Sequence, residues 1–211
     1  MKSNEIVTWM HEKEVEMMVK YLKEKPNSVM LEWGCGGSTL HFPKYVDKYV
    51  SIEHNLDWYV DVKKAIDGND INNIEFYLVD IPKGVPTKRE EFYDKWTTEI
   101  HDLSKLGMNT IPALDYCIYP KDKYIWMDYI DIVDEIPIKK YDFVLIDGRA
   151  RSDCAFKALQ YIDEESIVFI HDFWGREEYH AVLEYYDVID SVKHTLVPPA
   201  GMTIVALRRK K

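Results

Sequence analysis

Short apolar runs alternate along the chain with longer amphipathic stretches. Runs without polar interruption predict strands that are buried on both faces of a parallel sheet. Residues 29–31 and 143–146 are such runs, and the mostly apolar stretches 49–52, 73–79 and 166–170 are the other expected strands. Apolar residues that recur every three or four positions predict the helices between them. These helices are expected at residues 11–24, 57–66, 124–135, 153–162 and 176–186. The alternation predicts an α/β fold with a doubly wound, mostly parallel sheet and helices on both faces.

The last two predicted strands have a different connection. Apolar stretches at 188–196 and 202–207 are separated only by the Pro- and Gly-containing segment 197–201. Such a short connection cannot make the crossover that parallel strands need. We therefore expect these two strands to form an antiparallel pair.

An aromatic-rich insertion, residues 82–124, follows the third strand and interrupts the alternation. It contains several prolines and many aromatic side chains, such as Phe92, Tyr93 and Trp96. Long loops in compact domains tend to be functional or disordered, and this one is too aromatic for disorder. It predicts a substrate-recognising insertion; a structural lid or a dimer contact is the alternative. The chain length, residues 1–211, is that of a single domain.

A glycine-rich turn follows the first strand, which ends at Glu32. The turn contains Gly34, Gly36, Gly37 and Ser38. Glycines let a ligand approach the backbone closely, and the start of the next helix favours an anionic group. The second strand ends at Glu53, roughly 20 residues beyond the turn, where a carboxylate is positioned to bind ribose hydroxyls. These features predict a nucleoside-containing ligand.

The spacing separates two classes of cofactor. A dinucleotide fingerprint G-x-G-x-x-G would require glycine where this chain has Thr39. The pattern E-x-G-x-G-x-S from Glu32 to Ser38, with the distal Glu53, resembles motif I and the following acidic motif of class I, Rossmann-like S-adenosylmethionine (SAM) methyltransferases. The resemblance implies SAM as cofactor and a final strand that runs antiparallel beside the fifth.

The resemblance also implies roles for individual residues. The glycine turn would wrap the methionine portion of SAM, Glu53 would hold the ribose, and His54 would flank the adenosine. Asp80, after the third strand, would bind the adenine amino group, unless it is an ordinary loop carboxylate. Asp147, after the fourth strand, would point at the transferred methyl. The implied cofactor-binding residues are Glu32, Gly34, Gly36, Gly37, Ser38, Glu53, His54, Asp80 and Asp147.

Asp147, His171 and Asp172 form the predicted catalytic group. They follow the fourth and fifth strands, whose carboxyl ends should meet at one edge of the sheet. In one route His171 removes the acceptor proton, and we favour this route. In the other, Asp147 and Asp172 bind a divalent cation that lowers the pKa of the acceptor. Phe173 stands where similar catechol and sugar O-methyltransferases have Asn or Asp, which puts a complete metal site in doubt.

The resemblance extends to the acceptor. His171-Asp172 with the nearby Arg176 is similar to the plant glucuronoxylan 4-O-methyltransferases, which implies O-methylation of a sugar or a nucleotide-linked sugar. Arg149 and Arg151 either bind a carboxylate or phosphate of the substrate or form surface salt bridges. The alternatives are a methyltransferase acting on protein or nucleic acid, and a non-catalytic module that binds a partner.

Net charge, cysteine content and apolar run length exclude several classes of partner, site and location. The net charge of −10 opposes binding to a nucleic acid backbone, so a small-molecule substrate is expected. The three cysteines have neither the number nor the spacing of a disulfide framework or a C-x-x-C metal site. No apolar run approaches the length that spans a bilayer, and the first residues lack the apolar core of a signal peptide. These features predict a cytoplasmic protein without membrane contact.

Overall fold

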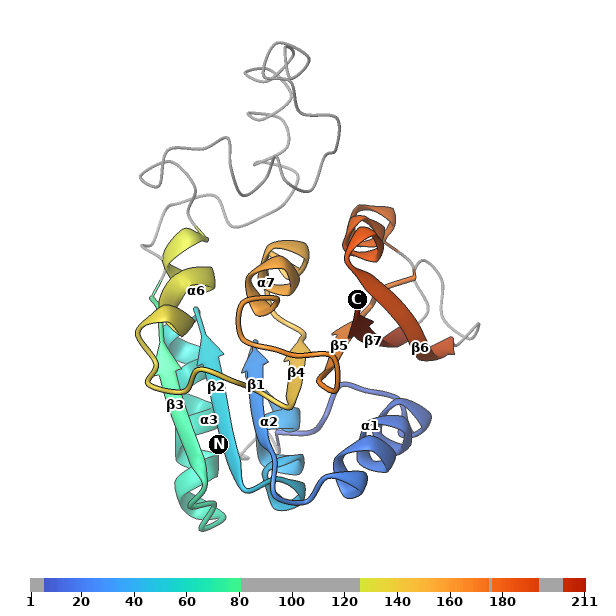
Figure 1. Ribbon diagram of the computed structural model, residues 1–211. Coiled ribbons are helices and arrows are strands. Elements are labelled where there is room, and N and C mark those ends of the chain that lie inside the picture. Colours follow the sequence, from blue (N-terminus) through green and yellow to red (C-terminus); the bar gives the residue numbers. More distant parts are fainter. Residues whose placement is uncertain (1–5, 81–125, 175, 194–202) are drawn as a thin grey trace.

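The computed structural model of the protein describes residues 6–80, 126–174, 176–193 and 203–211 (Figure 1). Their strands form one seven-stranded sheet with the order β3-β2-β1-β4-β5-β7-β6. The strands are β1 (Val29–Trp33), β2 (Lys48–Glu53), β3 (Ile74–Leu78), β4 (Phe143–Ile146), β5 (Ile167–His171), β6 (Tyr186–Lys193) and β7 (Thr203–Arg209). Strands β1 to β5 are parallel to one another, which confirms the predicted doubly wound sheet.

Strand β7 lies between β5 and β6 and is antiparallel to both. Ile204 of β7 pairs with His171 of β5 on one side and with Val192 of β6 on the other. The end of β6 therefore lies at the same edge of the sheet as the end of β5. This arrangement confirms the expected antiparallel last strand beside the fifth.

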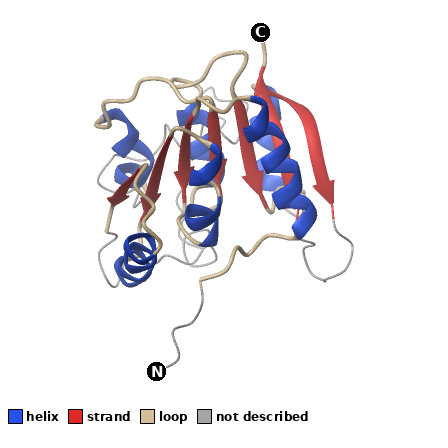
Figure 2. Ribbon diagram, turned by 90° about the horizontal axis from the view of Figure 1, so that it is seen from below, coloured by secondary structure: helices blue, strands red, loops and turns tan. Residues whose placement is uncertain are grey.

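Helices cover both faces of the sheet (Figures 1 and 2). One face carries α1 (Glu12–Glu24), α2 (Gly37–His41), the 3₁₀ helix η1 (Pro43–Tyr45) and α3 (Leu56–Gly68). The other carries α6 (Met127–Asp131), the 3₁₀ helix η3 (Ile132–Asp134), α7 (Arg151–Ala158) and the 3₁₀ helix η4 (Glu177–Glu184). Successive strand residues point to opposite faces. Met30 accordingly packs in the cluster with Met18 of α1, whereas Leu31 packs in the cluster with Ile130 of α6.

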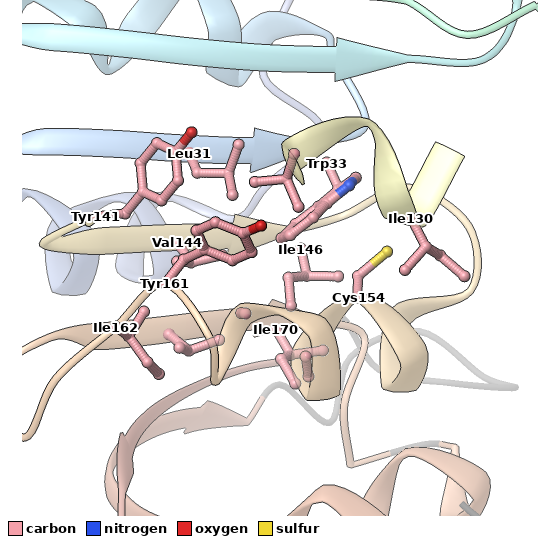
Figure 3. Packing of buried hydrophobic residues seen from close by; sticks show 14 of the residues in the cluster. Leu31, Trp33, Ile130, Tyr141, Val144, Ile146, Cys154, Tyr161, Ile162 and Ile170 are labelled. Atoms are coloured by element: carbon pink, nitrogen blue, oxygen red, sulfur yellow. The ribbon is translucent and has the colours of Figure 1, made fainter. Parts of the chain in front are cut away.

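The core beneath α6 and α7 fixes the ends of the central strands. Figure 3 shows Trp33, Ile146 and Ile170, from β1, β4 and β5, packed with side chains from α6 and α7. Burying one such side chain stabilises the fold by about 1.5–3 kcal/mol. The Trp33 indole N–H also donates to the Tyr129 carbonyl at 3.1 Å, so its polar atom is satisfied and α6 is held over β1.

Three predicted helices differ in detail. The helix expected at 153–162 is α7, which begins at Arg151 and already ends at Ala158. The helix expected at 124–135 is α6 continued by η3, and the helix expected at 176–186 is the 3₁₀ helix η4. Both keep their predicted places, because short 3₁₀ turns commonly extend or replace short helices. The predicted insertion, 82–124, lies outside the described residues. Within the described part of the chain, no helix combines the length and apolar composition needed to cross a bilayer.

Candidate functional site

The turn after β1 packs directly against the turn after β4. Gly34 has φ +96°, a left-handed conformation that favours glycine. Its N–H donates to the Ile52 carbonyl at 2.8 Å. A Cβ on Gly34 would lie 2.4 Å from the Cα of Gly148. Gly34 is therefore required for the close approach that joins the ends of β1 and β4 into one edge.

Gly148→Ala is expected to destabilise the protein by about 1–3 kcal/mol in urea unfolding. A Cβ there would lie 2.2 Å from the Tyr129 hydroxyl, which is buried and has no hydrogen-bond partner among the described residues. Tyr129→Phe removes this oxygen, so the double variant should regain part of the loss. If Gly148→Ala costs the same free energy in both backgrounds, this steric explanation is wrong.

The middle of the glycine turn is open at Gly36 and covered at Gly37. Among the described residues, a Cβ on Gly36 would meet only the Trp58 ring within 4 Å, at 3.9 Å. The Trp58 indole N–H donates to the Cys35 carbonyl at 2.8 Å. At Gly37, a Cβ would lie 2.1 Å from the Thr8 amide nitrogen, because the N-terminal segment crosses the start of α2 there. A ligand can thus approach the backbone at Gly36.

Glu32 lies beneath this turn with no exposed surface. Its carboxylate accepts hydrogen bonds from the hydroxyls of Ser38 (2.5 Å), Thr39 (2.7 Å) and Ser51 (2.6 Å). Burial raises the pKa of Glu32 to about 7, although the hydroxyls act to lower it. Glu32 and Ser38 therefore bind each other and stabilise the turn from below. Their direct contact with a cofactor stays a prediction.

Glu32 is expected to make the protein less stable at pH 8 than at pH 5, by about 3 kcal/mol. Its pKa is raised from the ordinary 4.5 to about 7, so the folded state binds this proton more tightly than the unfolded state does. The stabilisation is complete below the unfolded value and is lost as the pH rises through the folded value. Urea unfolding at both pH values should show the parent losing about 3 kcal/mol more than Glu32→Gln, which cannot ionise. Identical losses in the two proteins would contradict this role.

Glu53 ends β2 beside the glycine turn and is only 3% exposed. Its two oxygens accept from the backbone N–H of Cys35 (3.0 Å) and of Asn55 (2.8 Å), and His54 Nδ1 lies 3.0 Å away. Burial raises the pKa of Glu53, but the hydrogen bond and charge of His54, the Asn55 N–H and the Cys35 side chain outweigh it and lower the pKa. Glu53 is therefore ionised at neutral pH. Each oxygen keeps a lone pair that can accept a further hydroxyl.

An aromatic group covers the end of β2. The His54 ring meets Trp126 and Tyr129 edge to face, with centroid distances of 5.1 and 5.6 Å. Asp80 follows β3 and is exposed. Glu53, His54 and Asp80 thus lie along the adjacent carboxyl ends of β2 and β3, where the sequence places an adenosine site. Their contacts with a nucleoside stay predictions.

The structure brings Asp147, His171 and Asp172 together at the ends of β4 and β5. His171 Nδ1 lies 3.0 Å from Asp147 Oδ1 and 3.7 Å from Asp172 Oδ1. Asp172 has φ +57°, an uncommon conformation for a residue with a side chain. Its carboxylate lies 3.2 Å from the Arg176 guanidinium. Parallel neighbours in the sheet explain the convergence, as the sequence predicted.

Both ring nitrogens of His171 face carboxylates. Nδ1 faces Asp147, and Nε2 lies 3.5 Å from Glu14 Oε2. Burial acts to lower the pKa of His171, but the hydrogen bonds and charges of Asp147, Glu14 and Asp172 raise it to about 10. At neutral pH His171 is therefore an imidazolium, which has no lone pair to accept a proton. This geometry opposes the general-base role that the sequence favoured.

Arg151 lies between the two aspartates and is 8% exposed. Its guanidinium is 3.2 Å from Asp147 Oδ1 and 3.4 Å from Asp172 Oδ2, and it also donates to the His171 carbonyl. These internal contacts occupy the guanidinium, so the suggestion that Arg151 binds an anionic substrate does not fit. Arg149, by contrast, is exposed.

The residues do not fit the divalent cation considered for Asp147 and Asp172. A cation bound by both carboxylates would have to share their space with the positive charge of Arg151. No group of three or more His, Cys, Asp or Glu side chains within the described ranges is placed to hold a metal. We assign no metal-dependent step to this site.

Sequence reasoning missed Glu14 as part of this cluster. Glu14 is fully buried on α1 together with Met17, Met18 and Leu22. A signal was present, because Glu14 precedes Met18 by four residues and Leu22 by eight. This spacing places a carboxylate on the apolar face of the helix, where an unpaired charge is costly.

Comparison with known proteins shows the fold. The chain matches no protein-family model, and no curated protein matches it significantly. Among solved structures, a methyltransferase-like protein from Silicibacter pomeroyi is 20% identical, with a TM-score of 0.59, over 97% of this chain and 90% of that one. An rRNA methylase from Streptococcus thermophilus is 10% identical, with a TM-score of 0.59, over 96% of this chain and 99% of that one.

A further neighbour was solved with a bound ligand. It is a putative methyltransferase from Streptococcus mutans in complex with SAH, 9% identical, with a TM-score of 0.57, over 95% of this chain and all, 100%, of that one. The sheet order and these neighbours establish that the chain has the class I SAM-dependent methyltransferase fold.

Proposed function

We propose that the protein is a SAM-dependent methyltransferase that methylates a hydroxyl of a small polar acceptor. The observation that carries the proposal is Glu53, an ionised carboxylate held at the end of β2 beside the backbone that is open at Gly36. SAM supplies a methyl group on a positively charged sulfur, which makes that carbon electrophilic. Glu53, His54 and Asp80 would hold the adenosine, and the turn at Gly36 would hold the methionine portion.

Asp147 is the proposed proton acceptor. Its side chain is 24% exposed, whereas that of His171 is 6% exposed, so Asp147 is the member of this pair that can meet an acceptor. Burial raises the pKa of Asp147, but the hydrogen bond from His171 and the charge of Arg151 lower it overall. A carboxylate with a low pKa is a weak base, so it takes the proton late in the reaction. By then the hydroxyl oxygen has begun to bond to the methyl carbon, which makes its proton more acidic. His171 and Arg151 orient Asp147 for that transfer.

For the acceptor we propose a sugar or a nucleotide-linked sugar. Two side chains near Asp172, the cationic Arg176 and the aromatic Trp174, support a polar acceptor that contains a sugar ring. Arg176 pairs with Asp172 and its side chain is 35% exposed, and Trp174 lies under the Lys193 ammonium, 3.9 Å from the ring centroid. Cationic donors bind hydroxyl and phosphate oxygens well. The net charge of −10 weighs against nucleic acid, although one neighbour is an rRNA methylase.

The cysteines support a cytoplasmic location for this enzyme. Cys35 and Cys154, the two cysteines in the described ranges, are free and buried. Free buried thiols are typical of proteins in reducing compartments.

Calorimetry followed by an acceptor panel tests the proposal. SAM and its demethylated product should both bind the purified chain, and ATP is the matched control because it shares the adenosine alone. Radiolabelled methyl should then transfer to a member of a panel of free sugars and nucleotide sugars, with RNA and a protein mixture as comparison arms. Absence of SAM binding would refute the methyltransferase assignment. Transfer to RNA or protein instead of a sugar would refute the acceptor class.

A further inference from the structure

Glu14 brings helix α1 into the proposed catalytic site. The helix begins at Glu12, and Glu14 turns inward with no exposed surface. Glu14 Oε2 accepts the His11 backbone N–H at 2.7 Å, which closes a capping box at the start of the helix. Its other oxygen, Oε1, has no hydrogen-bond partner among the described residues. A buried carboxylate with so few donors is costly unless a positive charge faces it.

The positive charge that faces Glu14 is His171. His171 Nε2 lies 3.5 Å from Glu14 Oε2, and Nδ1 lies 3.0 Å from Asp147 Oδ1 on the opposite side of the ring. The imidazole is therefore held between two carboxylates from elements far apart in sequence, by a hydrogen bond at Nδ1 and by an ion-pair contact, too long for a hydrogen bond, at Nε2. Its rotation about the side-chain bonds would break one contact or both. In this arrangement Glu14 determines where the ring, and with it the Nδ1–H donor to Asp147, is held.

Charged side chains of the described residues meet around His171. The carboxylates are Glu14 from α1, Asp147 after β4 and Asp172 after β5, and the cations are His171, Arg151 from α7 and Arg176. Within this set of described residues, and with His171 protonated, three negative groups face three positive ones. Removing the charge of Glu14 leaves His171 paired on one side only. The effect should then reach Asp147, because Asp147 and His171 share a hydrogen bond.

The same N-terminal segment also covers the proposed cofactor turn. The backbone of Val7 and Thr8 packs on Gly37, where an added Cβ would lie 2.2 Å from the Val7 carbonyl carbon. Residues 7–14 thus contact the glycine turn at one end and His171 at the other. A contiguous stretch of eight residues spans both halves of the site.

We infer that Glu14 is a positioning residue for methyl transfer, which holds His171 so that Asp147 is presented to the acceptor hydroxyl. The inference rests on the proposed function for its catalytic meaning. The contact between Glu14 and His171 can be tested without it.

Histidine ¹⁵N NMR of Glu14→Gln tests the contact. In the parent, both ring nitrogens of His171 should stay protonated at pH 8. In Glu14→Gln the pKa of His171 should fall by about one unit or more, because one of its two facing carboxylates becomes neutral. Glu16→Gln is the matched control, since Glu16 is exposed on the same helix, and it should leave His171 unchanged. An unchanged His171 pKa in Glu14→Gln would overturn the inference. If Glu14→Gln does not fold, two other variants replace it: Glu14→Asp, which keeps the charge, and Glu14→Met, which removes it. Glu14→Met should lower the pKa of His171 more than Glu14→Asp does.

Kinetics then separate positioning from cofactor binding. With an acceptor from the panel, Glu14→Gln should lower kcat about tenfold or more, whereas the Kd for SAM should stay within about twofold. Equal kcat in Glu14→Gln and the Glu16→Gln control would overturn the positioning role even if the His171 pKa shifts. Failure of the parent to bind SAM would refute the proposed function, and that result is distinct from any change at His171.

Discussion

Asp147→Asn should lower turnover by about 10²–10⁴-fold with whichever acceptor the panel identifies. The amide keeps the size of the carboxylate and its hydrogen bond with His171, but it cannot take the acceptor proton. The Kd for SAM should change by less than about tenfold, because the principal cofactor contacts are assigned to Glu53 and the glycine turn. Single-turnover kinetics with saturating SAM measure the chemical step directly.

Two comparisons make this result specific to Asp147. Asp187→Asn is the matched control, because Asp187 lies exposed on β6, away from the β4 and β5 ends. It should leave turnover unchanged. The pH profile separates Asp147 from His171 as proton acceptor, since a neutral imidazole would be needed for the latter. A pKa of about 10 for His171 means that activity through a histidine base would rise steeply above pH 8. Turnover of Asp147→Asn within twofold of the parent would rule out Asp147 as the proton acceptor.

Glu53→Gln should weaken SAM binding by about 2–4 kcal/mol, which is roughly 30- to 900-fold in Kd. The ribose hydroxyls both donate, and the carboxylate can accept both, whereas the amide has one accepting oxygen and one donating nitrogen. The amide also loses its charge-assisted bond with the Cys35 N–H, which links Glu53 to the glycine turn. Calorimetric titration with SAM measures the loss.

The control for this variant is Glu75→Gln on the neighbouring strand β3. Glu75 is paired with Lys48 at 2.5 Å and lies before the carboxyl end of β3, so its change should leave SAM affinity within twofold. A thermal unfolding scan of both variants shows whether either loses the fold. SAM affinity in a folded Glu53→Gln protein equal to that of the parent would remove Glu53 from the ribose site, and with it the main support for the cofactor.

The cluster of Asp147, His171 and Asp172 shows how much of the candidate site could be predicted from the order of residues in the sequence. Each of the two buried strands Phe143–Ile146 and Ile167–His171 is followed by polar residues at its carboxyl end. Parallel pairing of adjacent strands brings such ends together whatever the side chains are. Proximity was therefore predictable. The protonation state of His171 was not, because it depends on a third carboxylate from another part of the chain.

The apolar periodicity, the glycine spacing and the short 197–201 connection by themselves determined the element order, the parallel strands with an antiparallel final pair, and the edge that carries the polar residues. These properties follow from local rules, since burial patterns repeat at the period of a strand or a helix and only glycine adopts the Gly34 conformation readily. Tertiary packing decided the direction of each polar side chain. Glu32 turned inward to three hydroxyls, Arg151 filled the gap between two aspartates, and Glu14 reached His171 across 157 positions of sequence. Such contacts join residues that no local pattern relates, because a buried charge takes whichever partner the folded chain places beside it.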